Sequence, residues 1–196
     1  VGLSRSGLGG PDGVDIRACD VGVYASVAQA LADVARDASL FGLVNAAGIA
    51  SMNLAISTPS TTVQRIIQTN LVGTINCCIA LAKRFARNKN GRIVNFSTIA
   101  VPLALKGESI YVASKAGVEG FSRSFAREMS DFDTTVNVVA PGPIDTDLIA
   151  AVPRGAIGRI VDRQIMPRRF DKSDVVDLIR FLLSEQSRMI SGQIFN

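Results

Sequence analysis

Tyr111 and Lys115 are the residues whose types and spacing point most directly to chemistry. They stand four apart on a helix predicted from about Ser109 to Met129, so their side chains lie on one face, one turn apart. A phenol has a pKa of about 10, and a nearby ammonium stabilises the phenolate, which eases proton transfer in either direction. The same spacing also arises by chance, so the surrounding segments must support a catalytic assignment.

The composition excludes several other kinds of active site. The 196 residues include no His, which removes the usual base of serine and cysteine hydrolases and the commonest metal ligand. We therefore expect no metal site, and proton transfer must use Tyr, Lys, Asp or Glu. The net charge is only +4, and two Tyr without any Trp offer few stacking platforms, so nucleic-acid binding is not expected.

Length and hydrophobicity predict one globular domain over residues 1–196, with 47% hydrophobic and 19% charged residues. No apolar run approaches the roughly 18 residues that cross a bilayer, and the first residues do not resemble a secretion signal, so no membrane association is expected. Cys19, Cys77 and Cys78 cannot all pair with one another, which favours a reducing cytoplasm.

Strands and helices alternate along the chain. Short apolar runs predict strands at Leu43 to Ala47, Arg92 to Ser97, Thr135 to Ala140 and in the final Ile-Phe-Asn. Capping boxes predict helices that begin at Ser26 and at Thr61, and the spacing of apolar residues predicts another over 175–182. Nearly all-apolar strands that alternate with helices indicate an α/β fold, whose parallel sheet is covered on both faces and binds ligands at the strands' carboxyl ends.

Five segments, taken in order, carry a resemblance to a known family. They are NAAG at 45–48, Asn70 within an apolar helical stripe, GRIVNFST at 91–98, YVASKAG at 111–117 and NVVAPGPIDTD at 137–147. This order resembles the short-chain dehydrogenase/reductase family, especially its 3-oxoacyl-carrier-protein reductase-like members, over almost the whole chain. The resemblance implies a Rossmann-type doubly wound parallel sheet, a nicotinamide cofactor and hydride transfer to or from a carbonyl or alcohol.

The resemblance also implies four catalytic residues. Tyr111 would protonate the carbonyl oxygen, and Lys115 would bind the nicotinamide ribose and ease ionisation of the phenol. Asn70 would hold a water that connects Lys115 to solvent. The hydroxyl that polarises the carbonyl falls at Thr98, where the family usually has Ser, and the extra methyl is a departure that could crowd the substrate. Ser97 should point to the other side of the strand.

The cofactor residues follow from the same resemblance. Arg5 stands where an acidic residue would bind the adenosine ribose, and a guanidinium there suits a 2′-phosphate, so NADP(H) is favoured over NAD(H). The other positions are Asp20 and Val21 for the adenine, Asn45, Ala46 and Gly48 beneath the adenosine ribose, Tyr111 and Lys115, and Pro141, Gly142, Ile144 and Thr146 for the nicotinamide side.

The family's first strand and glycine-rich turn are not matched in this chain. The glycines at 7, 9, 10 and 13 lead into VDIRACD, a predicted strand, rather than into a helix whose amino end would face a pyrophosphate. We therefore expect the natural protein to extend beyond both ends of the sequence. We also expect a gap in the middle of the sheet, and poor cofactor binding by a chain that truly begins at Val1.

Substrate and partners are less constrained by the sequence. A lid over about 147–167 is expected, and the arginines in and just after it, Arg154, Arg159, Arg163, Arg168 and Arg169, would suit an anionic or acyl-thioester carbonyl substrate, although solvated arginines are equally ordinary. Small residues on the Tyr111 helix, Ala113, Ala116, Gly117, Gly120 and Ser124, permit close approach of another helix. The family pairs this helix across subunits, so a homodimer or homotetramer is expected, with packing inside one subunit as the alternative.

The sequence thus predicts a cytoplasmic NADPH-dependent reductase of a 3-oxoacyl compound or related ketone. Two alternatives stay open: an alcohol, sugar or dihydrodiol dehydrogenase of the same family, and a binding or regulatory protein of the same fold without turnover.

Overall fold

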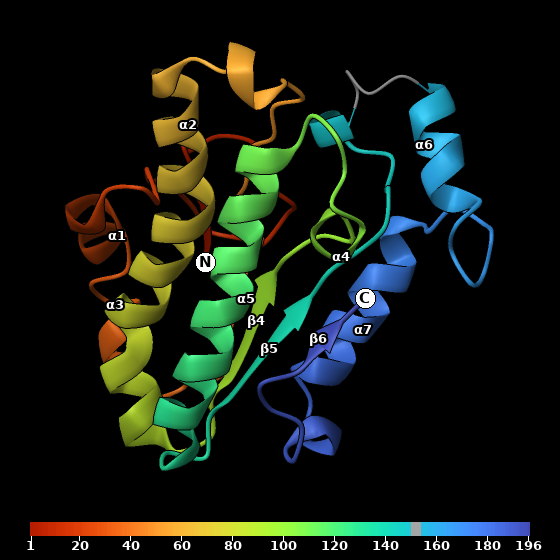
Figure 1. Ribbon diagram of the computed structural model, residues 1–196. Coiled ribbons are helices and arrows are strands. Elements are labelled where there is room, and N and C mark those ends of the chain that lie inside the picture. The colour runs from red at the N-terminus through yellow and green to blue at the C-terminus, as the bar shows by residue number, and fades with distance from the viewer. Residues whose placement is uncertain (150–153) are drawn as a thin grey trace.

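The computed structural model describes residues 1–149 and 154–196, and this part of the chain contains two parallel sheets (Figure 1). The larger sheet has the order β3-β4-β5-β6, and the smaller one pairs β1 with β2. The strands are β1 (Gly2–Ser4), β2 (Ile16–Ala18), β3 (Gly42–Asn45), β4 (Arg92–Phe96), β5 (Thr135–Val139) and β6 (Ile194–Phe195). All the pairings are parallel, so the carboxyl ends of the strands in each sheet share one edge.

Helices connect the strands. They are α1 (Tyr24–Ala30), α2 (Ser60–Ile67), α3 (Gly73–Asn88), α4 (Ala100–Leu103), α5 (Ser109–Ser130), α6 (Arg154–Val161) and α7 (Lys172–Leu182). Short 3₁₀ turns cover Val34–Arg36, Ala55–Ser57, Asp147–Ile149 and Glu185–Ser187. A π-helical turn, Gln68–Val72, joins α2 to α3 in one continuous helical run.

Alternate residues of the central strands face two separate cores. On β4, Ile93 packs with residues of α1, α3 and α5, whereas Val94 packs with Leu182 and other apolar residues of α7. On β5, Val136 and Val139 divide between the two cores in the same way. Helices therefore cover both faces of the sheet, with α5 in front of β4 and β5 in Figure 1, and the Rossmann-type α/β fold class is confirmed.

The expected gap in the sheet is present in the described part of the chain. β1 and β2 pair with each other in parallel, and no ladder joins them to β3. The loop after β2 is instead attached to the long helical run: the Gln68 side chain donates to the carbonyl of Gly22, and Asn76 Nδ2 donates to the carbonyl of Val21 at 2.9 Å.

Both predicted capping boxes are wrong. α1 begins at Tyr24, so Ser26 lies inside it, and the Ser26 hydroxyl accepts a hydrogen bond from the backbone of Asp20 at 3.1 Å. α2 begins at Ser60, where the carbonyl of Pro59 receives the first helical hydrogen bonds in place of a side-chain cap. A true capping box occurs at the start of α7, between Asp171 and Asp174.

The helical run Ser60–Asn88 is long and apolar enough, by length and composition alone, to cross a membrane. The run is not an uninterrupted apolar stretch, because polar residues such as Gln64, Arg65 and Gln68 lie within it. Buried side chains of the run, among them Cys77, Cys78 and Phe85, pack in the core beside the sheet and α5, as in any core helix of a folded domain. Burial raises the pKa of the Cys77 thiol to about 12, so this thiol is a packing group at neutral pH.

Candidate active site

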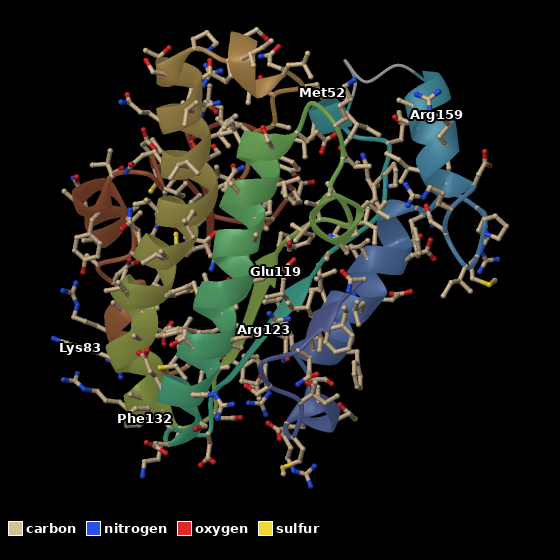
Figure 2. The ribbon with its side chains drawn as sticks, in the orientation of Figure 1. Met52, Lys83, Glu119, Arg123, Phe132 and Arg159 are labelled. Atoms are coloured by element: carbon tan, nitrogen blue, oxygen red, sulfur yellow. The ribbon has the colours of Figure 1, made fainter. Side chains whose placement is uncertain are left out.

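A pocket of about 360 Å³ opens where β3, β4 and β5 end. Residues within 46–52, 96–100, 105–115, 141–149 and 157–160 line it, so its walls come from the loops that follow three strands, from the start of α5 and from α6. Figure 2 labels Met52, which lines this pocket, and Arg159 on α6 at the same end of the molecule. The position agrees with the general rule that open parallel sheets bind ligands at their carboxyl edge.

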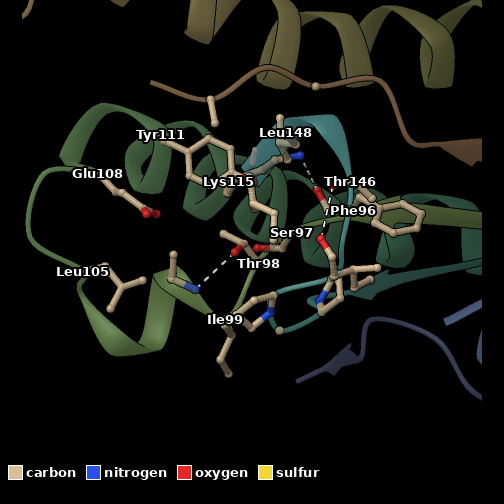
Figure 3. Close-up of a pocket in the computed structure, with 18 of the residues that line it drawn as sticks. Phe96, Ser97, Thr98, Ile99, Leu105, Glu108, Tyr111, Lys115, Thr146 and Leu148 are labelled. Carbon is tan, nitrogen blue, oxygen red and sulfur yellow. Dashed lines mark hydrogen bonds between the residues drawn. The ribbon is translucent and has the colours of Figure 1, made fainter. Parts of the chain in front are cut away.

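Tyr111 lies in the first turn of α5 and faces the pocket, where it is 7% exposed (Figure 3). Burial, with a smaller contribution from the charge of Glu108, raises the pKa of its phenol to about 12, and hydrogen bonding by the Thr98 side chain acts in the opposite direction. Desolvation of the phenolate dominates the shift in the protein alone, and the role expected of Lys115 in easing ionisation of the phenol stays a prediction.

Lys115 shares the face of α5 with Tyr111 and is 4% exposed. Its Nζ donates a hydrogen bond to the backbone carbonyl of Phe96 at 2.9 Å, which ties α5 to the end of β4. Burial lowers the pKa of the amine to about 8, and no carboxylate forms an ion pair with it in the described part of the chain. The amine is thus poised to lose or gain a proton near neutral pH.

Thr98 and Ser97 follow β4 and point in different directions. The Thr98 hydroxyl lines the pocket with Tyr111 and accepts a hydrogen bond from the backbone of Ala100 at 3.2 Å. The Ser97 hydroxyl instead donates to Oε1 of Glu119 on α5 at 2.6 Å. Both residues line the pocket, but the Ser97 hydroxyl is engaged by Glu119, so the Thr98 hydroxyl is the one available beside Tyr111.

Asn70 is fully buried in the π-helical turn, and its side-chain amide is fully hydrogen bonded. Oδ1 accepts from the backbone of Ile49 at 2.8 Å, and Nδ2 donates to the carbonyl of Ile49 at 2.9 Å and to the hydroxyl of Ser114 at 3.0 Å. The amide therefore fastens the loop after β3 to α5. A Cβ added at Gly48 would lie 3.5 Å from both Asn70 Oδ1 and Lys115 Nζ, so Asn70 is near Lys115 although it does not line the pocket.

All the cofactor positions expected on the nicotinamide side line this pocket. These are Tyr111, Lys115, Pro141, Gly142, Ile144 and Thr146. The Thr146 hydroxyl donates to the carbonyl of Ile144 at 3.3 Å, so the loop after β5 turns back on itself at the pocket wall.

Of the positions expected on the adenosine side, Ala46 and Gly48 line the pocket, whereas Arg5, Asp20, Val21 and Asn45 lie outside its lining. Arg5 is exposed after β1, and Asp20 accepts a hydrogen bond from the backbone of its own turn at Gly22, at 2.9 Å. Val21 is directed at Gly73, where an added Cβ would come within 2.7 Å of the valine side chain. Asn45 is buried between strands and donates to Oδ1 of Asn95 at 2.8 Å, so in this structure its side chain stabilises the sheet.

The segment expected to form a lid contributes apolar side chains to the pocket. Leu148, Ile149, Ile157 and Ile160 line it from the 3₁₀ turn and α6. Residues 150–153 and the side chains of Asp147 and Arg154 lie outside the described part. The other arginines, Arg159, Arg163, Arg168 and Arg169, are exposed and do not line the pocket, so the described lid presents hydrocarbon rather than positive charge to a ligand.

Glu108 lines the pocket and was missed in the sequence. It stands three residues before Tyr111 and seven before Lys115, a spacing that places all three side chains on one face of a helix. That spacing was the available signal. Burial raises the pKa of the Glu108 carboxyl above its ordinary value.

The small-residue strip on α5 divides between two environments. A Cβ added at Gly117 would come within 2.8 Å of the Leu71 side chain, so this glycine permits close packing of α5 against the π-helical turn of the same chain. Ala113, Ala116, Gly120 and Ser124 are exposed.

Comparisons with known proteins agree with this arrangement. A family model described as enoyl-(acyl carrier protein) reductase matches residues 8–196. The chain is 33% identical over 151 residues to a 3-oxoacyl-acyl-carrier-protein reductase FabG of Staphylococcus epidermidis, and 34% identical over 160 residues to the protein of that name in Staphylococcus aureus. These alignments cover 77% and 82% of this chain, but only 62% and 65% of the relatives.

A vertebrate relative is similar over a larger share. The chain is 36% identical over 177 residues to carbonyl reductase family member 4 of Danio rerio, an alignment that covers 90% of this chain and 72% of that protein. The chain belongs to the short-chain dehydrogenase/reductase family. Within that family, it is similar to 3-oxoacyl-carrier-protein reductases.

Proposed function

We propose that the protein is an NADPH-dependent oxidoreductase that reduces the carbonyl of a ketone or 3-oxoacyl compound to an alcohol. The observation that carries this proposal is the convergence of Tyr111, Lys115 and Thr98 on one pocket at the carboxyl edge of the sheet. The similarity to proteins named 3-oxoacyl-acyl-carrier-protein reductase and carbonyl reductase supports the same reaction class.

The pocket suits the nicotinamide end of such a cofactor. Its lining is mainly apolar, as a planar aromatic ring requires, and backbone of the loop 141–146 forms one wall. Gly48 leaves Lys115 Nζ uncovered on the side of the loop after β3, where ribose hydroxyls could accept its hydrogen bonds. Ile144 and Thr146 would hold the carboxamide side. A bound nicotinamide would supply the hydride that reduces the carbonyl carbon.

Residues of the chain would donate the proton that the reduction needs and replace it afterwards. Tyr111, whose phenol is protonated at neutral pH, would donate its proton to the carbonyl oxygen as the C=O π bond breaks and the new C–H and O–H bonds form. The Thr98 hydroxyl would donate a hydrogen bond to the same oxygen and orient it. The Lys115 ammonium would stabilise the resulting phenolate, and a water near Asn70 would return a proton from solvent.

A high pKa for Tyr111 favours the direction of reduction. Burial and the nearby Glu108 carboxylate both keep the phenol protonated, and a protonated phenol is the form that reduction consumes. Arg5 supports NADPH as the reductant, since a guanidinium binds a 2′-phosphate through paired hydrogen bonds. We further propose an acyl thioester or small ketone as substrate, a homodimer or homotetramer as the working form, and the cytoplasm as its location.

A carbonyl panel assayed with NADPH and with NADH tests this proposal. Oxidation of NADPH should depend on both the carbonyl compound and the enzyme, and the product should be the corresponding alcohol by mass spectrometry. Turnover that is faster with NAD⁺ and alcohols than with NADPH and ketones would point to the dehydrogenase reaction. Absence of turnover with any carbonyl or alcohol would favour a binding protein of the same fold.

A further inference from the structure

Glu108 is an acidic side chain directed into a pocket that is otherwise mainly hydrocarbon. Figure 3 shows its carboxyl group directed toward the space between Tyr111, Thr98 and Leu105. The apolar neighbours in that wall include Met52, Leu105, Leu148 and Ile157. Among the lining residues whose side chains the structure describes, Glu108 and Lys115 are the charged ones, and no ion pair joins them.

The carboxyl group of Glu108 has no structural task that accounts for its position. Glu108 is the N-cap residue of α5, but its side chain makes no capping hydrogen bond. Its backbone amide and carbonyl are used by Leu105 and Val112, and no described side chain or backbone group donates to the carboxylate. Glu108 is partly buried, and partial burial of a carboxylate without a protein donor is unfavourable and raises the carboxyl pKa. A ligand that brought a donor would offset this cost.

The carboxyl group is also close to the reacting position. Glu108 and Tyr111 are one helical turn apart, and the charge of Glu108 contributes to the raised pKa of Tyr111. A group on the substrate that reached Glu108 would therefore be attached near the carbonyl that Tyr111 protonates.

We propose that Glu108 determines substrate specificity by accepting a hydrogen bond from a hydroxyl group attached close to the reacting carbonyl, and by repelling a carboxylate at the same place. The substrate class is thus a hydroxyketone or a ketone with a comparable donor, rather than a 2-oxo acid. This inference rests on the proposed carbonyl reduction and adds to it the identity of the neighbouring group. It assigns Glu108 a role in substrate selection and none in proton transfer.

Three small ketones of similar size test the proposal: hydroxyacetone, butanone and pyruvate. Hydroxyacetone has a hydroxyl where butanone has a methyl. The ratio of their kcat/KM values therefore measures how much the hydroxyl donor contributes to recognition. Glu108→Leu should lower the hydroxyacetone-to-butanone ratio by about tenfold, the effect of one net hydrogen bond. Glu108→Gln, which keeps an acceptor and loses the charge, should retain most of that ratio and raise the pyruvate-to-butanone ratio by a similar factor.

Glu128→Gln is the matched control, because Glu128 is an exposed glutamate on the same helix and outside the pocket. It should leave both ratios within twofold of the parent protein. Ratios that stay within twofold in Glu108→Leu and Glu108→Gln, while turnover continues, would overturn the role of Glu108 and leave the reductase proposal intact. Failure of the parent protein to reduce any carbonyl would instead overturn the proposed function.

A binding measurement keeps the test independent of turnover. Saturation-transfer NMR with hydroxyacetone and butanone needs neither cofactor nor catalysis. The parent protein and Glu128→Gln should give a stronger signal with hydroxyacetone than with butanone, and Glu108→Leu should lose this difference. Equal signals for the two ketones in the parent protein would contradict the inference.

Discussion

The buried amine of Lys115 donates a hydrogen bond to the backbone carbonyl of Phe96 at 2.9 Å. This contact joins the middle of the pocket face of α5 to the last residue of β4. Thr98 follows two residues later, and Tyr111 lies one turn earlier on α5, so the contact helps to hold the two hydroxyl-bearing residues together in the same pocket.

Tyr111→Phe should lower kcat by about a hundredfold to ten-thousandfold, the usual contribution of a general acid. The change removes one oxygen atom, whose hydrogen-bonding partner in the described part of the chain is the Thr98 side chain in the pocket, so the fold should persist. Binding of NADPH, measured by the fluorescence of the reduced nicotinamide, should stay within about threefold. A variant that kept more than a tenth of the parent turnover would exclude Tyr111 as the proton donor.

Thr98→Ser should retain or increase activity, because the hydroxyl remains and the methyl that narrows the pocket is removed. Thr98→Val keeps the shape without the hydroxyl and should lower kcat/KM by about a hundredfold, as expected for loss of one donor to the developing oxyanion. Ser97→Ala is the neighbouring control, because Ser97 also lines the pocket but its hydroxyl donates to Glu119. Equal activity of Thr98→Val and the parent protein would remove Thr98 from the mechanism.

Lys115→Met should change how stability depends on pH. Folding lowers the pKa of this amine from 10.5 to about 8, so the unfolded chain binds more protons between those values and stability rises with pH across that window. Below pH 8 the folded protein carries the full cost of the buried ammonium. Relative to the parent protein, the free energy of unfolding of Lys115→Met should therefore fall by about 2 to 3 kcal/mol between pH 7 and pH 10.

Urea unfolding at a series of pH values measures this difference. Tyr111 ionises in both proteins, so its own raised pKa cancels in the comparison. A difference between Lys115→Met and the parent protein that stays constant from pH 7 to pH 10 would contradict a lowered pKa for Lys115.

Asn70→Ala should lower the free energy of unfolding by about 2 to 4 kcal/mol, because it leaves buried partners at Ile49 and Ser114 without their hydrogen bonds. Asn88→Ala is a matched control at the end of the same helical run, since Asn88 makes one side-chain bond, to the carbonyl of Leu40 at 2.8 Å. The control should cost about 1 kcal/mol in the same denaturant titration. If the two variants lost equal free energy of unfolding, the Asn70 side chain would stabilise the fold no more than a single hydrogen bond does.

Arg5→Glu should shift the preference from NADPH toward NADH by at least about tenfold in kcat/KM, because a carboxylate repels the 2′-phosphate and accepts from the ribose hydroxyl. Arg87→Glu makes the same charge change at an exposed position on α3, far from β1 in sequence, and should leave the ratio unchanged. An unaltered ratio in Arg5→Glu would remove this residue from cofactor selection.

The main elements of the fold could be predicted because their signals are local. The apolar runs at β4 and β5 and the periodic stripe of the long helical run each depend on residues within one element, and the structure has them within a residue or two. Helix starts were harder. The Ser26 hydroxyl could bond either to the start of its own helix or to the backbone of Asp20. The residue spacing is the same in both cases, so the sequence does not distinguish them.

Site residues could be predicted where the helix period decides geometry, as for Tyr111 and Lys115. Asn45 shows where this reasoning ends: its amide bonds Asn95, 50 residues away, and no local pattern identifies that partner. The pKa of Tyr111 is a second example. The spacing between Tyr111 and Lys115 could be read from the sequence, but the burial that raises the pKa of the phenol depends on segments that meet only in the folded chain.

The π-helical turn places Gln68 and Asn70 two residues apart with their side chains attached to different loops. Gln68 holds the loop after β2 at Gly22, and Asn70 holds the loop after β3 at Ile49. A cofactor that extended across this edge of the sheet would contact both loops. Both loops are attached to the same helical turn, so a substitution that disturbs this turn is expected to weaken cofactor binding at both ends of the site.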